Sequence, residues 1–184
     1  MGVTKPRTVR DTRPGAARGT EAKAARITME WIGTAARLLL AAVLGYAGLL
    51  KIQDLTEAGR TVALYRIVPE DLAQLVGGAL PFVELALALL LVAGLATRAV
   101  AAATVALMVM YIAAITSVWA RGLSIDCGCF SSGGTVTSGA ERGYVIDIAR
   151  DLVFLAAAVL LVRSPRTRYA LDRWVLEELE EKER

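Results

Sequence analysis

The sequence predicts an all-α integral membrane protein, a bundle of four transmembrane helices with both termini in the cytoplasm. Of its 184 residues 55% are apolar, above the 45–50% of soluble domains, although 21% are charged. The charged residues gather at the two ends, and apolar runs near the bilayer length of about 20 residues fill the middle. A soluble bundle would keep a polar stripe on each helix, and the two central runs have none. These observations favour a membrane protein.

Three regions follow in order along the chain. Residues 1–30 hold seven Lys/Arg and three acidic residues without apolar periodicity, so we expect a disordered basic tail. Residues 31–163 form the four-helix domain, with spans predicted at 31–50, 72–95, 99–120 and 143–162. Residues 54–68 have apolar residues on one helical face, which predicts a short helix at the outer interface. Residues 164–184 are predicted to form an amphipathic cytoplasmic tail.

The spans differ in how many polar groups they carry. The first contains Arg37, the second contains Pro81 and Glu84, and the third has no charged residue. The fourth is the weakest, because three charged residues crowd its first half: Asp147, Arg150 and Asp151.

Lys/Arg placement predicts the orientation, because positive residues are enriched on the cytoplasmic side. The side with both termini would carry fourteen Lys/Arg and the other side five. We therefore expect a multi-pass protein of the plasma (inner) membrane. The loop between the third and fourth spans, with both cysteines, would be extracytoplasmic.

The two cysteines, Cys127 and Cys129, flank one glycine. On the oxidising side of a membrane they can form a disulfide, and so small a ring departs from relaxed geometry and is readily reduced. This favours thiol–disulfide exchange. A structural bridge, a bond between subunits, and half a metal site with Asp126 remain alternatives. The absence of histidine excludes Cys-His nucleophile pairs and His-ligated zinc or haem.

Ionisable groups within the spans form the second candidate site. Measured from the predicted outer boundary, Glu84 lies about 18 Å deep and Arg150 about 10 Å deep, so they are expected to pair. Arg37 is the competing partner of Glu84, and Lys51 is expected to extend to the interface. A pocket of Lys51, Glu84 and Arg150 would hold a quinone head group, a small anion or a thiol substrate. Alternatively, the charges serve helix packing alone.

Several motifs resemble the MauE branch of the DoxX-like membrane proteins over residues 33–163. They are RLLL and YAGLLK in the first span, YRIVP, LPFVEL, DCGCF, and Arg150-Asp151 in the last span. Many relatives continue the cysteine motif as CGCFG, whereas here Phe130 is followed by Ser131.

The resemblance implies four transmembrane helices, Cys127 and Cys129 as the redox pair, and Lys51, Glu84 and Arg150 as polar, cofactor-binding positions. The MauE namesake is implicated in maturing the disulfide-rich small subunit of methylamine dehydrogenase, alongside a thioredoxin-like partner. DoxX relatives are associated with thiol or thiosulfate oxidation coupled to quinone.

Two functions follow. The first is a thiol–disulfide oxidoreductase component that works with an extracytoplasmic thioredoxin-like protein or a disulfide-containing client, with quinone as the candidate cofactor. The second is a non-catalytic membrane assembly or transport subunit with structural charges. The bilayer is an expected partner in both, and no metal or nucleic acid is expected in either.

Overall fold

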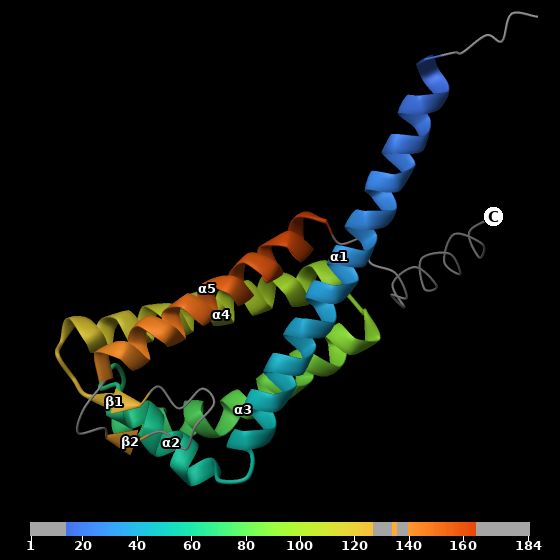
Figure 1. Cartoon of the computed structure of the whole chain (residues 1–184). Coiled ribbons are helices and arrows are strands. Elements are labelled where there is room, and N and C mark those ends of the chain that lie inside the picture. The colour runs from blue at the N-terminus through green and yellow to red at the C-terminus, as the bar shows by residue number, and fades with distance from the viewer. Residues whose placement is uncertain (1–13, 127–133, 136–139, 165–184) are drawn as a thin grey trace, which may run out of the picture.

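The computed structural model describes residues 14–126, 134–135 and 140–164. These residues form five helices and two short strands (Figure 1). In chain order the elements are α1 (Pro14–Lys51), α2 (Leu55–Leu64), α3 (Glu70–Ala93), α4 (Thr97–Ala120), β1 (Ile125–Asp126), β2 (Gly134–Thr135) and α5 (Ala140–Arg163). The predicted helical fold is confirmed, and the strands add a small antiparallel ribbon that the sequence analysis did not anticipate.

The ends of α2 and α3 follow from local sequence. Asp54 caps α2, because its side chain accepts a hydrogen bond of 2.9 Å from the backbone N–H of Glu57. Pro69 precedes α3, whose first turn carries acidic side chains at the positive end of the helix dipole. Gly94 ends α3 in the left-handed conformation, with φ of 66°. The helix predicted within residues 54–68 is therefore present.

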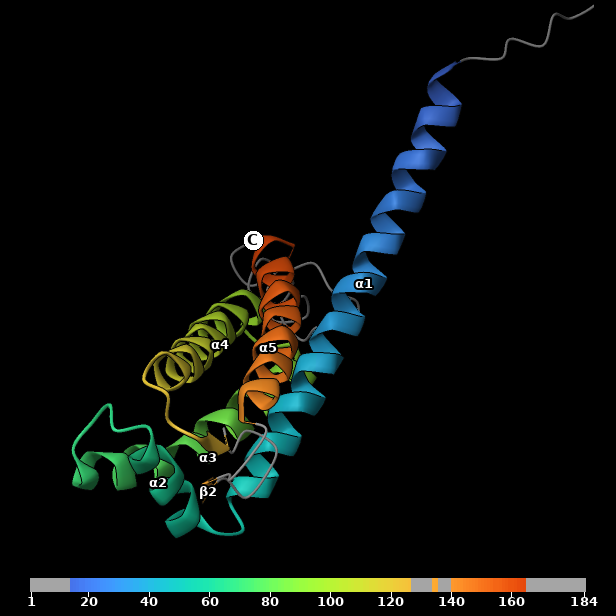
Figure 2. The ribbon, with the colours of Figure 1, turned by 60° about the vertical axis from the view of Figure 1, so that its left-hand side comes forward.

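Helix α1 begins at Pro14, within the 30 residues assigned to a disordered tail from the sequence. Residues 14–30 include five alanines, and alanine has the highest helix propensity. The helix of the first span can therefore begin well before residue 31. Figures 1 and 2 both show this part of α1 projecting beyond the other helices.

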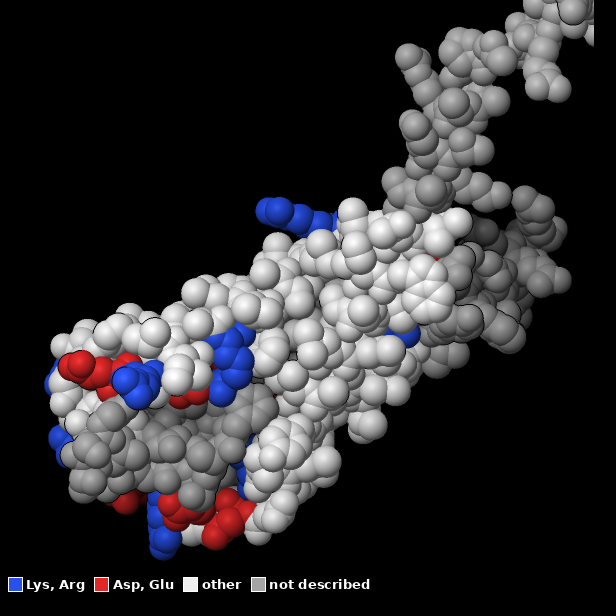
Figure 3. All heavy atoms as spheres, viewed as in Figure 1, with Lys and Arg blue, Asp and Glu red and all other residues white. Residues whose placement is uncertain are grey.

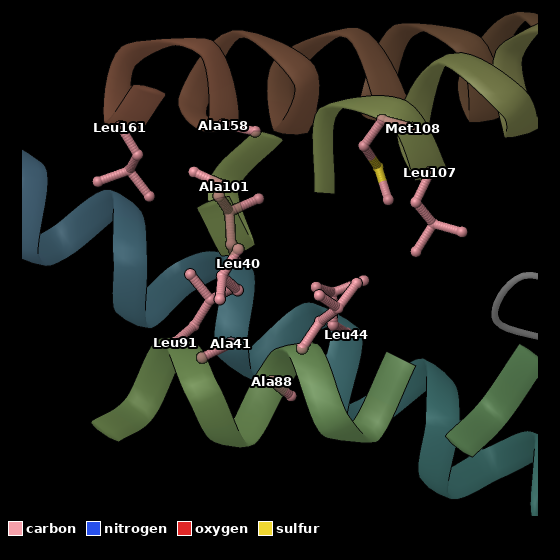
Figure 4. Close-up of a cluster of buried hydrophobic side chains, with 12 residues drawn as sticks. Leu40, Ala41, Leu44, Ala88, Leu91, Ala101, Leu107, Met108, Ala158 and Leu161 are labelled. Carbon is pink, nitrogen blue, oxygen red and sulfur yellow. The ribbon is translucent and has the colours of Figure 1, made fainter. Parts of the chain in front are cut away.

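The four long helices pack around one apolar core. Helix α1 packs most extensively on α3, and α4 packs most extensively on α5. Buried side chains from all four helices meet between these pairs (Figure 4). They include Leu40 and Leu44 of α1, Leu91 of α3, Met108 of α4 and Leu161 of α5.

The outer surface of the helices is apolar. Figure 3 shows an almost uncharged surface over the helical body, with charged atoms gathered at the end that carries α2 and the strands. Exposed side chains on the helices include Leu39, Phe82, Leu89, Val109 and Val153. Contiguous exposed apolar surface of this kind is typical of contact with lipid.

Three described segments are long and apolar enough to cross a membrane: Ile27–Lys51, Glu70–Ala93 and Thr97–Ala120. Helix α5 has the length of a span, but Asp147, Arg150 and Asp151 lower its hydropathy. Membrane insertion of α5 and the cytoplasmic location of both termini therefore stay predictions.

Candidate functional site

A buried ion pair joins α1 to α3. The Nζ atom of Lys51 lies 2.6 Å from Oε1 of Glu84, and the two side chains are 12% and 1% exposed. Tyr111 of α4 donates its hydroxyl hydrogen bond to the same carboxylate oxygen, and its Oη lies 3.4 Å from Nζ of Lys51. Nζ also lies 5.3 Å from the centre of the Tyr111 ring, within the range of a cation–π contact. We call these three residues the Lys51 cluster.

The crossing of α1 and α3 positions the cluster. Gly48 lies so close to α3 that an added Cβ would be 2.8 Å from Cγ of Leu85. Glu84 is fourteen residues, about 21 Å, beyond the first residue of α3. The end of α1 therefore lies beside the middle of α3. The prediction that Lys51 extends to the interface is wrong. Its ammonium turns inward and compensates the buried carboxylate.

Arg150 has different partners from those expected. Its guanidinium lies 2.9 Å from Oδ1 of Asp147 and 3.1 Å from Oδ1 of Asp151, both on its own helix. The predicted Glu84–Arg150 pair is therefore wrong, because Lys51 takes its place beside Glu84. Arg37, the competing partner, is 2% exposed but lies fourteen residues, about 21 Å, along α1 from Lys51.

A cavity of about 370 Å³ lies beside the Lys51 cluster and is lined by α2, the connection that follows it, and parts of α1, α3 and α4. Lys51 and Tyr111 form polar points in a largely apolar wall. Pro81 has no N–H to donate to the carbonyl of Gly77, another residue of the wall. The other lining residues are Leu50, Asp54, Glu57, Ala58, Thr61, Val62, Tyr65, Ile67, Val68, Val76, Leu80, Met110 and Ala114.

Cys127 and Cys129 lie outside the described residues, but the two flanking strands are described. Ile125 pairs with Thr135 and Asp126 pairs with Gly134, so the residues directly before and after positions 127–133 lie side by side. The hydroxyl of Tyr144 in α5 accepts a hydrogen bond of 2.9 Å from the N–H of Ile125 and donates one of 2.6 Å to the carbonyl of Leu123. Tyr144 therefore holds the backbone at Leu123 and Ile125, which precede the cysteines in the sequence.

The same end of the molecule connects β1 to the cavity wall. Ile125 belongs to a buried apolar cluster that is packed against Tyr65, and Tyr65 lines the cavity. Arg121 at the end of α4 donates to the carbonyls of Tyr65 and Arg66, which ties α4 to the connection after α2. Strand β1, which precedes the cysteines in the sequence, and the cavity wall therefore share the contacts around Tyr65.

Tyr111 was missed in the sequence analysis, which treated its span as uncharged. A tyrosine near the middle of an apolar helix needs a partner for its hydroxyl group when it is buried. Its mid-span position is the signal that could have identified it.

The family model for methylamine utilisation protein MauE matches residues 29–164 of the chain. A curated protein of Paracoccus denitrificans, methylamine utilization protein MauE, is 36% identical over 100 residues. The match covers 54% of this chain and 54% of the relative, so the chain spans about half the length of that relative. No solved structure matches the chain.

Proposed function

The chain belongs to the MauE family, and on this premise we propose that it is a membrane thiol–disulfide redox protein that supports disulfide formation in an extracytoplasmic client. The observation that supports the proposal is the 370 Å³ cavity, with Lys51 and Tyr111 in its wall and β1 packed beside it. The name of the relative, a methylamine utilization protein, suggests a client in that process. We propose a thioredoxin-like protein as the carrier that exchanges disulfides between this chain and the client.

The exchange step conserves electrons and protons. A client or carrier dithiol attacks the Cys127–Cys129 disulfide, forms its own disulfide, and gives up two electrons and two protons. Cys127 and Cys129 take up the two electrons and the two protons and become two thiols. The three-residue CGC segment favours this direction, because a strained small-ring disulfide is more readily reduced than a relaxed one.

The cavity has the chemistry to hold a quinone. Its apolar walls suit an isoprenoid body, and Lys51 offers an ammonium donor for a carbonyl oxygen. A bound quinone would supply the acceptor for two electrons and two protons from the Cys127 and Cys129 thiols. Glu84 and Tyr111 hold the ammonium in place. Arg150 is not in the cavity wall, so we assign it to support of Asp151 and not to ligand contact.

We further propose that α5 is a fourth span and that both termini are cytoplasmic, in the plasma membrane. The distribution of fourteen Lys/Arg on one side and five on the other supports this orientation. The cysteine segment is then extracytoplasmic, where disulfides persist.

Redox titration in intact cells tests the function and the orientation together. After mild reduction, a membrane-impermeant maleimide should label Cys127 and Cys129, and labelling should disappear in one two-electron transition as the buffer becomes oxidising. The Cys127→Ser/Cys129→Ser variant is the background control and should leave client thiols unpaired. Labelling restricted to inverted vesicles would contradict the orientation. A pair that never titrates, or normal client disulfides in the double variant, would contradict the relay.

A second candidate is a non-catalytic assembly subunit. The partly buried cations Lys51 and Arg150 are both paired with carboxylates, an arrangement that can serve helix packing alone. This function predicts normal client disulfides in the double-serine variant and loss of a partner complex when the helices are disturbed.

Filling the cavity with a larger side chain tests whether it binds quinone. Ala114 lines the cavity, and Ala113, the preceding residue, is exposed and is not in its wall. We expect decylubiquinone at a hundredfold excess over its dissociation constant to stabilise the wild-type protein and the Ala113→Phe variant by about 2.7 kcal/mol. The Ala114→Phe variant should show no such shift in thermal unfolding. Equal stabilisation of both variants would place the quinone elsewhere.

A further inference from the structure

One apolar side of the large cavity lies between α3 and α4, well inside both helices. The two helices have 24 residues each and run in opposite directions from one turn at residues 94–96. Val76 and Leu80 line the cavity about 9 and 15 Å from the first residue of α3. Ala114 and Met110 line it about 9 and 15 Å from the last residue of α4. This side of the cavity therefore lies at the depth of the bilayer hydrocarbon.

The same side of the cavity reaches the outer surface of the helices. Val76 and Met110 line the cavity, yet they are 41% and 45% exposed. Their neighbours Leu75 and Val109 are exposed and are not in the wall, so the outer surface begins beside these two positions. Helices α3 and α4 pack on each other much less extensively than α1 packs on α3, and they spread apart from their shared turn (Figure 1). We call Val76 and Met110 the rim pair.

The polar side of the cavity suits an uncharged head group. The ammonium of Lys51, the cation that lines the described wall, is already compensated by Glu84 at 2.6 Å. Asp54 and Glu57 add two carboxylates to the same wall. A phosphate group would therefore meet negative charge without a free cation, which is unfavourable. A neutral carbonyl oxygen accepts a hydrogen bond from an ammonium without adding charge, so the wall favours a quinone over a phospholipid.

The size of the cavity limits how much of a quinone it encloses. Its volume of about 370 Å³ is near the lower end of the range of about 300–1,000 Å³ found for pockets that enclose drug-sized ligands. It can hold a quinone ring and the first part of a chain, and a chain of several isoprenoid units has to leave it.

We propose that the cavity binds a long-chain prenylquinone directly from the bilayer, with the ring near Lys51 and the chain passing between Val76 and Met110 into lipid. This inference rests on the proposed function, because it names the class of quinone and its route to that site. The chain moves from lipid to an apolar rim, so no apolar surface enters water. A route past α2 would lead the chain to the end where charged atoms gather (Figure 3).

Binding of two quinones that differ in the chain alone tests this route. Full-length protein in lipid nanodiscs is titrated with decylubiquinone and with the chainless dimethoxy-methyl-benzoquinone that has the same ring. We expect Val76→Trp and Met110→Trp to raise the dissociation constant of decylubiquinone about tenfold, the size of an overpacking penalty, and to change that of the chainless quinone less than about twofold. Leu75→Trp and Val109→Trp are the matched controls and should bind both quinones as the wild type does.

Photolabelling of the wild-type protein gives a second measurement that needs no variant. A ubiquinone with a diazirine on its chain should label α3 and α4 around the rim pair, and excess decylubiquinone should prevent the labelling. Labelling of α2 instead would overturn the route between α3 and α4. Rim variants that bind decylubiquinone as the wild type does, or that weaken both quinones equally, would also overturn it.

The outcomes separate this inference from the proposed function. A wild-type protein that binds decylubiquinone but is not labelled at the rim pair overturns the route and leaves the quinone site standing. A wild-type protein that binds neither quinone overturns the quinone site and the route together. A phospholipid that native mass spectrometry finds on the protein, and that decylubiquinone does not displace, would overturn the quinone as the occupant. The thiol titration is independent of all these results.

Discussion

Replacing Lys51 with methionine is expected to lower the free energy of unfolding by about 3–5 kcal/mol, because it leaves a buried carboxylate without its cation. Glu84 is 1% exposed, and the ammonium of Lys51 lies 2.6 Å away. Methionine replaces the aliphatic stem of lysine as far as Cε and removes only the ammonium group, so most of the loss reports the charge. Reversible unfolding in mixed micelles, followed by far-ultraviolet circular dichroism, measures the change.

The double variant Lys51→Met/Glu84→Gln separates pairing from packing. With both charges removed, most of the lost stability should return, because a neutral glutamine still accepts from Tyr111 and no unpaired charge remains. Arg60→Met is the matched control, since Arg60 is 67% exposed and pairs with Glu57 at 3.4 Å. Its loss should be about 1 kcal/mol or less. Equal losses of unfolding free energy in Lys51→Met and in the double variant would show that the ion pair contributes little to stability.

The sequence could predict the helices because their signals are local. The acidic first turn of α3, the Asp54 cap and the apolar run of α4 each depend on residues within a few positions. The start of α1 is the exception, since a basic composition suggested disorder where alanine allows helix to continue.

The partners within the candidate site depend on how helices align, which no local signal provides. Counting depth from each predicted span end placed Lys51 at the interface and Glu84 deep in the bilayer. In the structure α3 continues beyond the end of α1 and packs against α2 there, which brings the two residues to one level. This alignment depends on glycine contacts between helices, and the composition of each helix alone does not reveal which glycine is in contact.

Gly77 of α3 packs directly against the backbone of α2 beside the cavity. A Cβ atom added there would lie 2.5 Å from the carbonyl oxygen of Ala58 and 2.6 Å from Cα of Gly59, both backbone atoms of α2. Backbone atoms cannot move aside as a flexible side chain does. Gly77→Ala is therefore expected to push α2 away from α3 and to lower the free energy of unfolding by about 1–3 kcal/mol.

Gly78→Ala is a matched control at the next residue of the same helix. An added Cβ at Gly78 has no heavy atom within 4 Å, and alanine has a higher helix propensity than glycine, so this variant should be as stable as the wild type or slightly more stable. Because α2 forms one wall of the 370 Å³ cavity, Gly77→Ala should also weaken the stabilisation by decylubiquinone, and Gly78→Ala should not. If both variants unfold like the wild type and bind decylubiquinone equally, α2 does not depend on the Gly77 contact. If Gly77→Ala loses stability but keeps its quinone response, the α2 wall is not part of the quinone site, and the ligand contacts are restricted to α1, α3 and α4.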